Sequence, residues 1–112
     1  MFKRGEVYFC NLEGNLGAEQ SGCRPCVVIQ NNVGSKFAPT LIIAPLTSRL
    51  KKPLPTHVTV PKGELDAEKE STILCEQIRT IDKKRVKSYV GTCSAATVEA
   101  LNVAIKVSLG LE

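Results

Sequence analysis

The chain has 112 residues, of which 43% are hydrophobic, and these values suit one compact domain over residues 1–112 rather than a disordered chain. No apolar stretch could act as a signal peptide or cross a bilayer, so we expect a cytoplasmic protein without membrane contact. The net charge is +4, and the first 62 positions hold eight basic and three acidic side chains, which is compatible with a polyanionic partner.

The first half of the chain alternates apolar and polar residues in a way that predicts four short strands, at 5–10, 26–30, 40–46 and 57–60. Residues 31–35 are expected to turn the chain, and Pro45 marks an edge or a bulge of the third strand. Two long loops lie between these strands. Residues 11–22 contain three glycines, and residues 47–55 are basic and interrupted by prolines. Loops of this kind commonly carry function.

The second half predicts two more strands, at 71–75 and 85–91, and then a helix. Asp82 is expected to cap a short helical turn between the two strands. The helix is expected to begin after Ser94 as its N-cap and to stop at Gly110. Its apolar face holds Val98, Leu101, Ile105 and Leu109. These elements predict a mainly β fold, a small barrel-like sheet with a C-terminal α-helix packed on it.

The five cysteines are an odd number in a chain without an export signal, which favours reduced, buried thiols. Cys23 and Cys26 have the C-x-x-C spacing that also occurs at zinc and redox sites. No second pair of ligands with such spacing exists, and side chains three apart on a strand point to opposite faces. We therefore expect no metal site and no cofactor, with a redox role of the pair as the alternative.

The side chains available for catalysis are few, and this narrows the possible chemistry. A single histidine excludes a ribonuclease that uses two histidines as acid and base. The glycine-rich loops that bind nucleotides are absent, and so is an acidic cluster of the kind that binds magnesium. The polar residues gather instead in the two long loops and in the EQIRT segment that begins at Glu76.

Several motifs follow one another in a specific order. Residues 17–25 read G-x-E-Q-x-G-x-R-P, the apolar strand after them ends in Gln30-Asn31, and LPTHV, EQIRTID and SLGL come later. This ordered set covers nearly the whole chain and resembles the MazF/PemK family of toxin–antitoxin ribonucleases. The resemblance implies an SH3-like barrel, a homodimer, a MazE-like antitoxin as partner, and sequence-specific cleavage of single-stranded mRNA.

The resemblance also implies a cut that needs no metal ion, in which the ribose 2′-OH attacks the neighbouring phosphate and leaves a 2′,3′-cyclic phosphate and a 5′-OH. By correspondence with the family, Arg24 and Thr47 are the catalytic pair. A guanidinium matches phosphate oxygens and keeps its charge, so Arg24 suits stabilisation of the transition state better than proton transfer. Glu19 is the candidate proton acceptor, with closure of its loop as an equal alternative.

Further candidates for RNA contact lie in the loops and the EQIRT segment: Gln20, Ser21, Asn31, Ser48, Leu54, Pro55, Thr56, His57 and Gln77. For His57 and Gln77 a structural role is an equal alternative. Two other functions remain open, a CcdB-like toxin that binds DNA gyrase and cuts nothing, and an RNA-binding module without turnover. An arginine followed by proline, together with a threonine that ends the third strand, favours cleavage.

Overall fold

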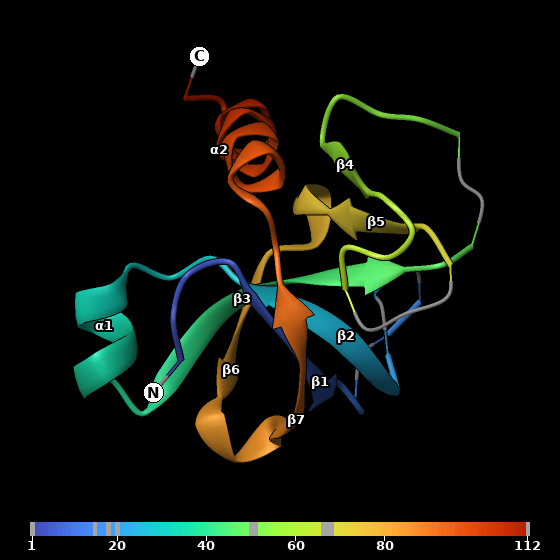
Figure 1. The fold of residues 1–112 in the computed structure, drawn as a ribbon. Helices are drawn as coiled ribbons and strands as arrows, with labels where there is room; N and C mark the ends of the chain where they lie inside the picture. The colour runs from blue at the N-terminus through green and yellow to red at the C-terminus, as the bar shows by residue number, and fades with distance from the viewer. Residues whose placement is uncertain are drawn as a thin grey trace.

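The computed structural model describes residues 2–14, 16–17, 19, 21–49, 52–65 and 69–111. Its strands are β1 (Glu6–Asn11), β2 (Cys23–Val28), β3 (Thr40–Thr47), β4 (His57–Val60), β5 (Ser71–Leu74), β6 (Arg79–Asp82) and β7 (Val86–Thr92). The helices are α1 (Asn32–Phe37) and α2 (Ala95–Leu109), with two 3-10 turns, η1 (Cys75–Gln77) and η2 (Lys83–Arg85). In the order of the sheet, the strands run β4-β5-β3-β2-β1-β7, and β6 pairs with β3 (Figure 1).

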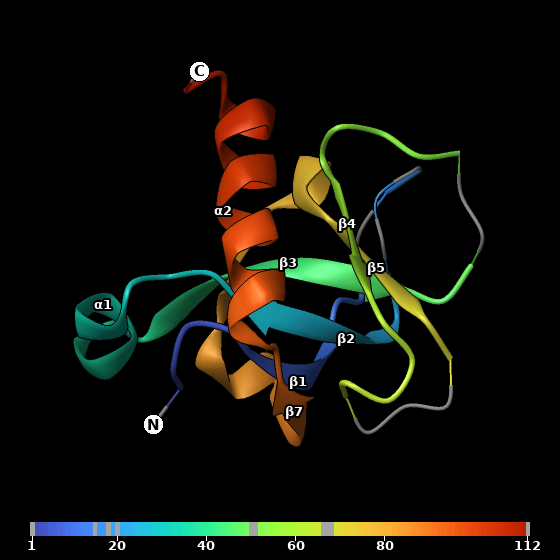
Figure 2. The same ribbon diagram turned by 45° about the horizontal axis from the view of Figure 1, so that its top comes forward.

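The sheet is antiparallel and bends so that β4 and β5 turn away from β1 and β2 (Figure 2). The predicted mainly β fold with a C-terminal helix is confirmed. Within the described ranges no pairing joins the outer strands β4 and β7, so the sheet is bent but does not close into a barrel. None of the helices in these ranges has the length and apolar character that crossing a bilayer demands.

Strand β3 is the centre of the fold because it pairs with three neighbours. Its first half pairs with β6, up to Ile43 opposite Arg79, and its end pairs with β5, starting at Leu46 opposite Ile73. Pro45 lies between these two stretches and is paired with Cys26 of β2. Proline lacks a backbone N–H, and here it removes no bond to β5 or β6 because neither strand pairs with it. Pro45 therefore marks a change of partner strand rather than the edge of the sheet.

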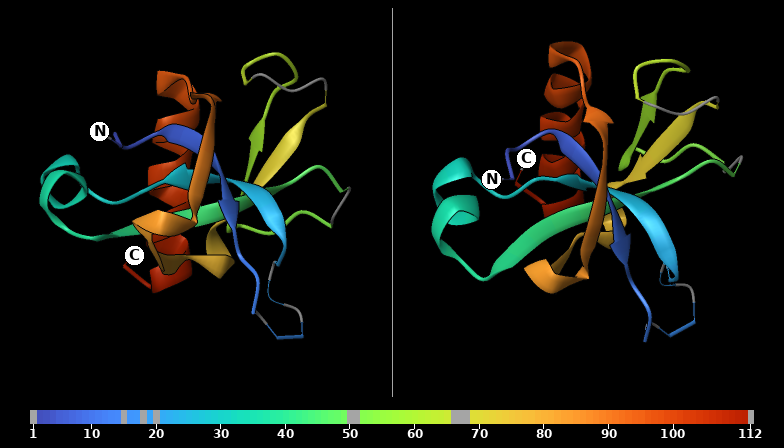
Figure 3. Two further views of the ribbon diagram at one scale, coloured as in Figure 1. Left: turned by 90° about the horizontal axis from the view of Figure 1, so that it is seen from below. Right: turned by 60° about the horizontal axis from the view of Figure 1, so that its bottom comes forward.

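Two apolar clusters lie on the two faces of the sheet. The larger fills the space between the bent sheet and α2, which packs against β4 and η1 (Figure 3). The smaller lies where β1, β2, β3 and β6 cross and includes the buried thiols of Cys10 and Cys26. The first long loop joins β1 and β2, and both strands contribute side chains to both clusters. This packing fixes where the loop begins and ends.

Helix α2 begins and ends as the sequence predicts. The Ser94 side chain accepts a hydrogen bond from the Thr97 backbone N–H at 3.2 Å, and Gly110 adopts a left-handed conformation with φ of 68°. Leu101 is fully buried, but the expectation for Leu109 is wrong because 57% of its surface is exposed. Ser108 takes the inward position of that turn and donates a hydrogen bond to the backbone oxygen of Cys75 at 2.6 Å.

Three local features differ from the sequence predictions, and a fourth agrees with them. The segment 31–35, predicted as a turn, enters helix α1, with the Asn31 side chain accepting from the Gly34 N–H at 2.7 Å. Strand β6 was not predicted, since it is four residues long and buries only Ile81. Asp82 caps η2 through the Lys84 N–H at 2.8 Å, as predicted. Strand β2 starts at Cys23, three residues earlier than predicted.

Candidate functional site

A cleft of about 670 Å³ lies where β2 begins and β3 ends. The register of the two strands decides which residues meet there. The pairing of the two strands ends at Cys26 and Pro45, and Arg24 and Thr47 each lie two residues beyond that pair, toward the start of β2 and at the end of β3. Both residues line the cleft. The antiparallel pairing thus brings together two side chains that are far apart in the sequence.

Arg24 is held by its backbone and by its side chain. The residue is paired with Cys10 of β1, and its Nε–H donates to the backbone oxygen of Ser21 at 2.8 Å. This bond uses the inner nitrogen of the guanidinium and leaves its two terminal NH₂ groups available to a ligand. A planar fork of this kind matches two oxygens of a phosphate. The side chain is half-buried beside the cleft, where water screens its charge less than on an open surface.

Thr47 is only 3% exposed and ends β3 opposite Thr72 of β5. Its Oγ1 accepts a hydrogen bond from the Arg49 backbone N–H at 3.2 Å. A hydroxyl that accepts through its oxygen still has its proton to donate. Thr47 therefore offers an O–H donor on a rigid strand end, in the same cleft as the Arg24 guanidinium.

Glu19, predicted as the proton acceptor, lies in the exposed part of the first loop. Its Oε1 accepts from the Leu16 N–H at 2.6 Å, and its own N–H donates to the Leu16 oxygen at 3.1 Å. The carboxylate closes a turn, and it is not among the residues that line the cleft. Gln20 lies outside the described residues, whereas Ser21 lines the cleft. The catalytic role of Glu19 stays a prediction.

A second cleft, of about 410 Å³, adjoins the first. Ser48 and Lys69 line both, so the two form one continuous trough. Arg49 and Glu70 also line the second cleft, together with His57. The trough therefore carries more positive than negative side chains, which suits a polyanion. Of the two lysines in the basic loop 47–55, Lys52 is exposed and Lys51 lies outside the described residues.

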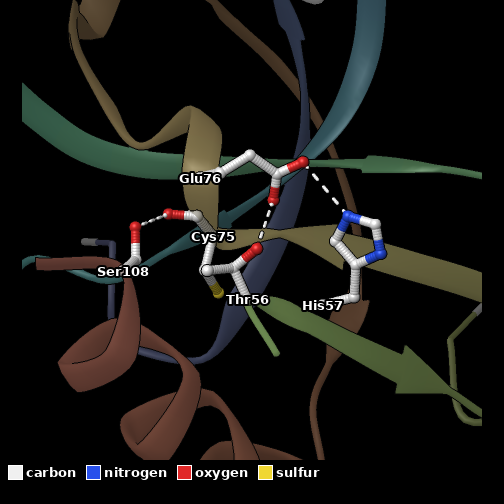
Figure 4. Close-up of polar contacts among 5 residues, drawn as sticks. All are labelled: Thr56, His57, Cys75, Glu76 and Ser108. Atoms are coloured by element: carbon white, nitrogen blue, oxygen red, sulfur yellow. Dashed lines mark hydrogen bonds and ion pairs between the residues drawn. The ribbon is translucent and has the colours of Figure 1, made fainter. Parts of the chain in front are cut away.

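His57, at the start of β4, is held by a carboxylate from η1. Its Nε2 lies 3.1 Å from Oε2 of Glu76, and the Thr56 hydroxyl donates to Oε1 of Glu76 at 2.9 Å (Figure 4). Partial burial acts to raise the pKa of the Glu76 carboxyl, but hydrogen bonds from its own backbone N–H, His57 and Thr56 outweigh that effect and lower the pKa. Glu76 is therefore ionised at neutral pH.

The remaining predicted RNA contacts lie outside the linings of the two clefts. Leu54 and Pro55 are exposed in the loop before β4, and Gln77 is half-buried on η1. Asn31 caps α1, which lies at the opposite end of β2 from the cleft (Figure 1). RNA contact by these residues stays a prediction. Sequence reasoning did not single out Lys69, whose position just before β5 acquires meaning only from the pairing of β5 with β3.

The two cysteines of the C-x-x-C spacing face different surroundings. Cys23 is exposed and lines the first cleft, whereas Cys26 is fully buried. Contact with the Cys10 thiol and burial raise the pKa of the Cys26 thiol, which keeps it protonated. Within the described ranges, no three His, Cys, Asp or Glu side chains gather as a metal site requires.

Residues 3–109 match the family described as PemK-like, MazF-like toxin of type II toxin–antitoxin system. The chain belongs to this toxin family. Endoribonuclease MazF of Staphylococcus saprophyticus is 46% identical over 112 residues, covering 99% of this chain and 93% of that protein. The resemblance inferred from the ordered motifs is thereby confirmed.

Solved structures share the PemK-like, MazF-like fold. An endoribonuclease in complex with its cognate antitoxin from a mycobacterial species has a TM-score of 0.84 at 24% identity, covering 100% of this chain and 98% of that chain. MazF from Deinococcus radiodurans has a TM-score of 0.83 at 23% identity, covering 96% of each chain. These likenesses confirm that the bent, open sheet with its C-terminal helix is the fold of MazF toxins.

Proposed function

We propose that this toxin-family protein is an endoribonuclease that cuts single-stranded mRNA at short preferred sequences without a metal ion. The observation that carries the proposal is the cleft that Arg24 and Thr47 line together, at the start of β2 and the end of β3. The MazF relative, an endoribonuclease at 46% identity over nearly the whole chain, supports the same activity.

The reaction we propose is an internal transesterification. The ribose 2′-OH attacks the adjacent phosphorus, the O2′–P bond forms and the P–O5′ bond breaks. The products are a 2′,3′-cyclic phosphate and a 5′-OH. Because nucleophile and phosphate already belong to one nucleotide, the protein chiefly aligns them and stabilises charge. Arg24 would hold two phosphate oxygens in the transition state, and Thr47 would donate a hydrogen bond to one of them.

The mechanism also requires an acceptor for the proton of the 2′-OH. A carboxylate can accept the 2′-OH proton, whereas a guanidinium retains its own protons. Glu19 is one of the two acidic residues of the first loop, with Glu13, and we assign the proton to it on its chemistry. A Glu19→Gln variant that turns over RNA at the rate of the wild type removes this assignment and leaves a water molecule as the acceptor.

The trough also supports a single-stranded substrate. An unstacked strand exposes the edges of its bases for hydrogen bonding, and Ser21, Ser48 and His57 line the two clefts that the strand would follow. Arg49 and Lys69 would neutralise phosphates along this path. The other predicted RNA contacts, Gln20, Asn31, Leu54, Pro55, Thr56 and Gln77, belong to the same proposal.

A homodimer and a MazE-like antitoxin complete the proposed function. Val103 and Val107 are exposed on α2 at a spacing of four residues, so they lie on one face of the helix that a second subunit can cover. An antitoxin with an acidic segment would fit the positively charged trough and block it. The mycobacterial relative was solved with its antitoxin, which supports a partner of this kind.

A CcdB-like toxin that binds DNA gyrase is the alternative, and Arg24 beside Thr47 in one cleft favours cleavage over it. The deciding experiment incubates the purified protein with single-stranded RNA and with DNA of the same sequence, each with and without a chelator. We expect cleavage of the RNA alone, at the same rate in the presence of the chelator. An intact RNA after long incubation with folded protein contradicts the proposal.

A further inference from the structure

Glu76 is a charged residue that the proposed reaction does not use, although its position is closely defined. It accepts hydrogen bonds from Thr56 and His57 through its two carboxylate oxygens (Figure 4). His57 in turn lines the second cleft, while Glu76 itself is not part of that lining. Glu76 therefore acts on the second cleft through His57, the lining residue that it contacts.

The backbone that carries Glu76 is anchored from two directions. The Cys75 N–H donates to the Thr56 backbone oxygen at 3.0 Å, and the Ser108 hydroxyl of α2 donates to the Cys75 oxygen at 2.6 Å. The Cys75 side chain is fully buried. Figure 4 shows the Ser108 contact with Cys75 beside the two contacts of the Glu76 carboxylate, which extends toward His57 from this anchored backbone. This arrangement holds the imidazole ring in one orientation.

The charge of Glu76 decides which nitrogen of His57 carries the proton. An ionised carboxylate can only accept hydrogen bonds, so the Nε2 atom that lies against it must bear a hydrogen. In the neutral imidazole the second nitrogen, Nδ1, is then an acceptor. Figure 4 shows Nδ1 on the side of the ring away from Glu76. His57 therefore presents a defined acceptor rather than a mixture of donor and acceptor.

We propose that Glu76 is a positioning residue for substrate recognition, which fixes the Nε2–H form of His57 so that Nδ1 accepts a hydrogen bond from an N–H of an unstacked base in the second cleft. This inference rests on the proposed function and deepens it. The first cleft carries the chemistry on Arg24 and Thr47, and the second recognises the neighbouring nucleotide. Ser48 and Lys69, which line both clefts, would contact the backbone that joins the two nucleotides.

The first test reads the imidazole directly and needs no variant. His57 is the single histidine of the chain, so labelling histidine with ¹⁵N gives one pair of ring signals without overlap. At a pH where the ring is neutral, we expect the nitrogen shifts and their couplings to ring protons to show the Nε2–H form alone. Detection of the Nδ1–H form, or of comparable amounts of both forms, overturns the inference whether or not the protein cuts RNA.

The second test uses steady-state cleavage of an RNA oligonucleotide. Glu76→Ala should raise KM about fivefold, the value of one neutral hydrogen bond, and leave kcat within about twofold. Glu76→Gln should show a smaller rise, because its amide oxygen can still accept from Nε2–H. The matched control is Glu99→Ala, which removes an exposed carboxylate on α2 away from both clefts. Thermal unfolding of each variant verifies that it is folded.

The double variant shows whether Glu76 acts through His57. If it does, Glu76→Ala combined with His57→Ala should have the same KM as His57→Ala alone. If the two substitutions raise KM independently, so that their effects multiply in the double variant, the inference is overturned. A Glu76→Ala variant with the KM of the wild type, or with a loss confined to kcat, also overturns it. If the wild type cuts RNA and these variants behave otherwise than expected, only this inference fails. If the wild type cuts no RNA, the proposed function fails and takes the inference with it.

Discussion

The two clefts of the trough adjoin each other, yet they are held in place in different ways. The first is built where β2 begins and β3 ends, just beyond their last paired residues, and both Arg24 and Thr47 line it. The second is lined by residues of β4 and β5 together with loop residues, and its His57 is held by the side chain of Glu76. Residues at the end of a central strand tolerate few substitutions, whereas the side chains of a network can be substituted one at a time. We therefore expect substitutions in the first cleft to affect the proposed chemistry and those in the second to affect the proposed recognition.

The largest expected effect comes from the first cleft. Arg24→Ala should reduce kcat about a thousandfold, because it removes a preorganised donor to the developing phosphate charge. Arg24→Lys should recover little of this loss, since an ammonium does not offer the planar fork. Lys87→Ala, which removes an exposed cation on β7, is the control and should cut RNA at the wild-type rate. An Arg24→Ala variant with wild-type turnover would show that the chemistry lies elsewhere.

The next largest effect should come from Thr47, where two variants distinguish the role of the hydroxyl from that of side-chain packing. Thr47→Val keeps the shape of a side chain that is almost fully buried and removes its hydroxyl, which is both the O–H donor and the acceptor of the Arg49 N–H. We expect kcat to fall about 10- to 100-fold, as for a hydrogen bond to a charged group. Thr47→Ser keeps the hydroxyl and should retain most of the activity. Equal activity of the valine and serine variants would assign Thr47 to strand structure alone.

A smaller effect should come from Lys69, where the clefts meet. Lys69→Ala should weaken RNA binding by a similar factor for every sequence, because a phosphate contact carries no base information. The slope of log K against log salt should become shallower by about 0.7, the value for one phosphate of a single strand. Lys62→Ala is the matched control, since Lys62 is exposed after β4 and lines neither cleft. An unchanged salt slope for Lys69→Ala would place the strand outside this junction.

The smallest effect concerns stability in acid. Hydrogen bonds from Thr97 and Ser94 outweigh partial burial and lower the pKa of the Glu64 carboxyl, and the pKa of Glu76 is also lowered. The unfolded chain therefore binds protons at these sites first as the pH falls below about 4.5. The contribution of both groups is fully present above that value and is lost as the pH drops through their folded pKa.

Thermal unfolding measured from neutral to acidic pH checks this prediction. Glu64→Gln should flatten the fall in Tm at acidic pH, while Glu99→Gln, which changes an exposed carboxylate, should leave it as in the wild type. A Glu64→Gln profile parallel to that of the wild type would mean that the bonds to Ser94 do not persist in solution.

The elements that the sequence predicts well are those whose signal is local. Apolar periodicity and the cap at Ser94 locate α2, and the apolar run of β3 is evident at once. Strand β6 escapes prediction because only its pairing, such as Ile81 opposite Leu41, makes it a strand. The inward place of Ser108 likewise depends on η1, which packs against α2.

The same distinction applies to the site. Arg24 and Thr47 were found because they belong to an ordered set of motifs, but their place in one cleft follows from the pairing of β2 with β3, which no local pattern encodes. Lys69 and Glu76 are single charged residues without a periodic signal, so only the fold shows that one lines both clefts and the other holds His57.

The most direct measurement of the central claim is mass spectrometry of the cleavage products. A short single-stranded RNA is digested in the presence of a chelator, alongside the same oligonucleotide with 2′-deoxyribose at the cleaved position. If the 2′-OH is the nucleophile, we expect fragments that end in a 2′,3′-cyclic phosphate and begin with a 5′-OH, and no cut in the deoxy-substituted strand. Fragments with a 3′-OH and a 5′-phosphate, or cleavage of the deoxy-substituted strand, would contradict the central claim.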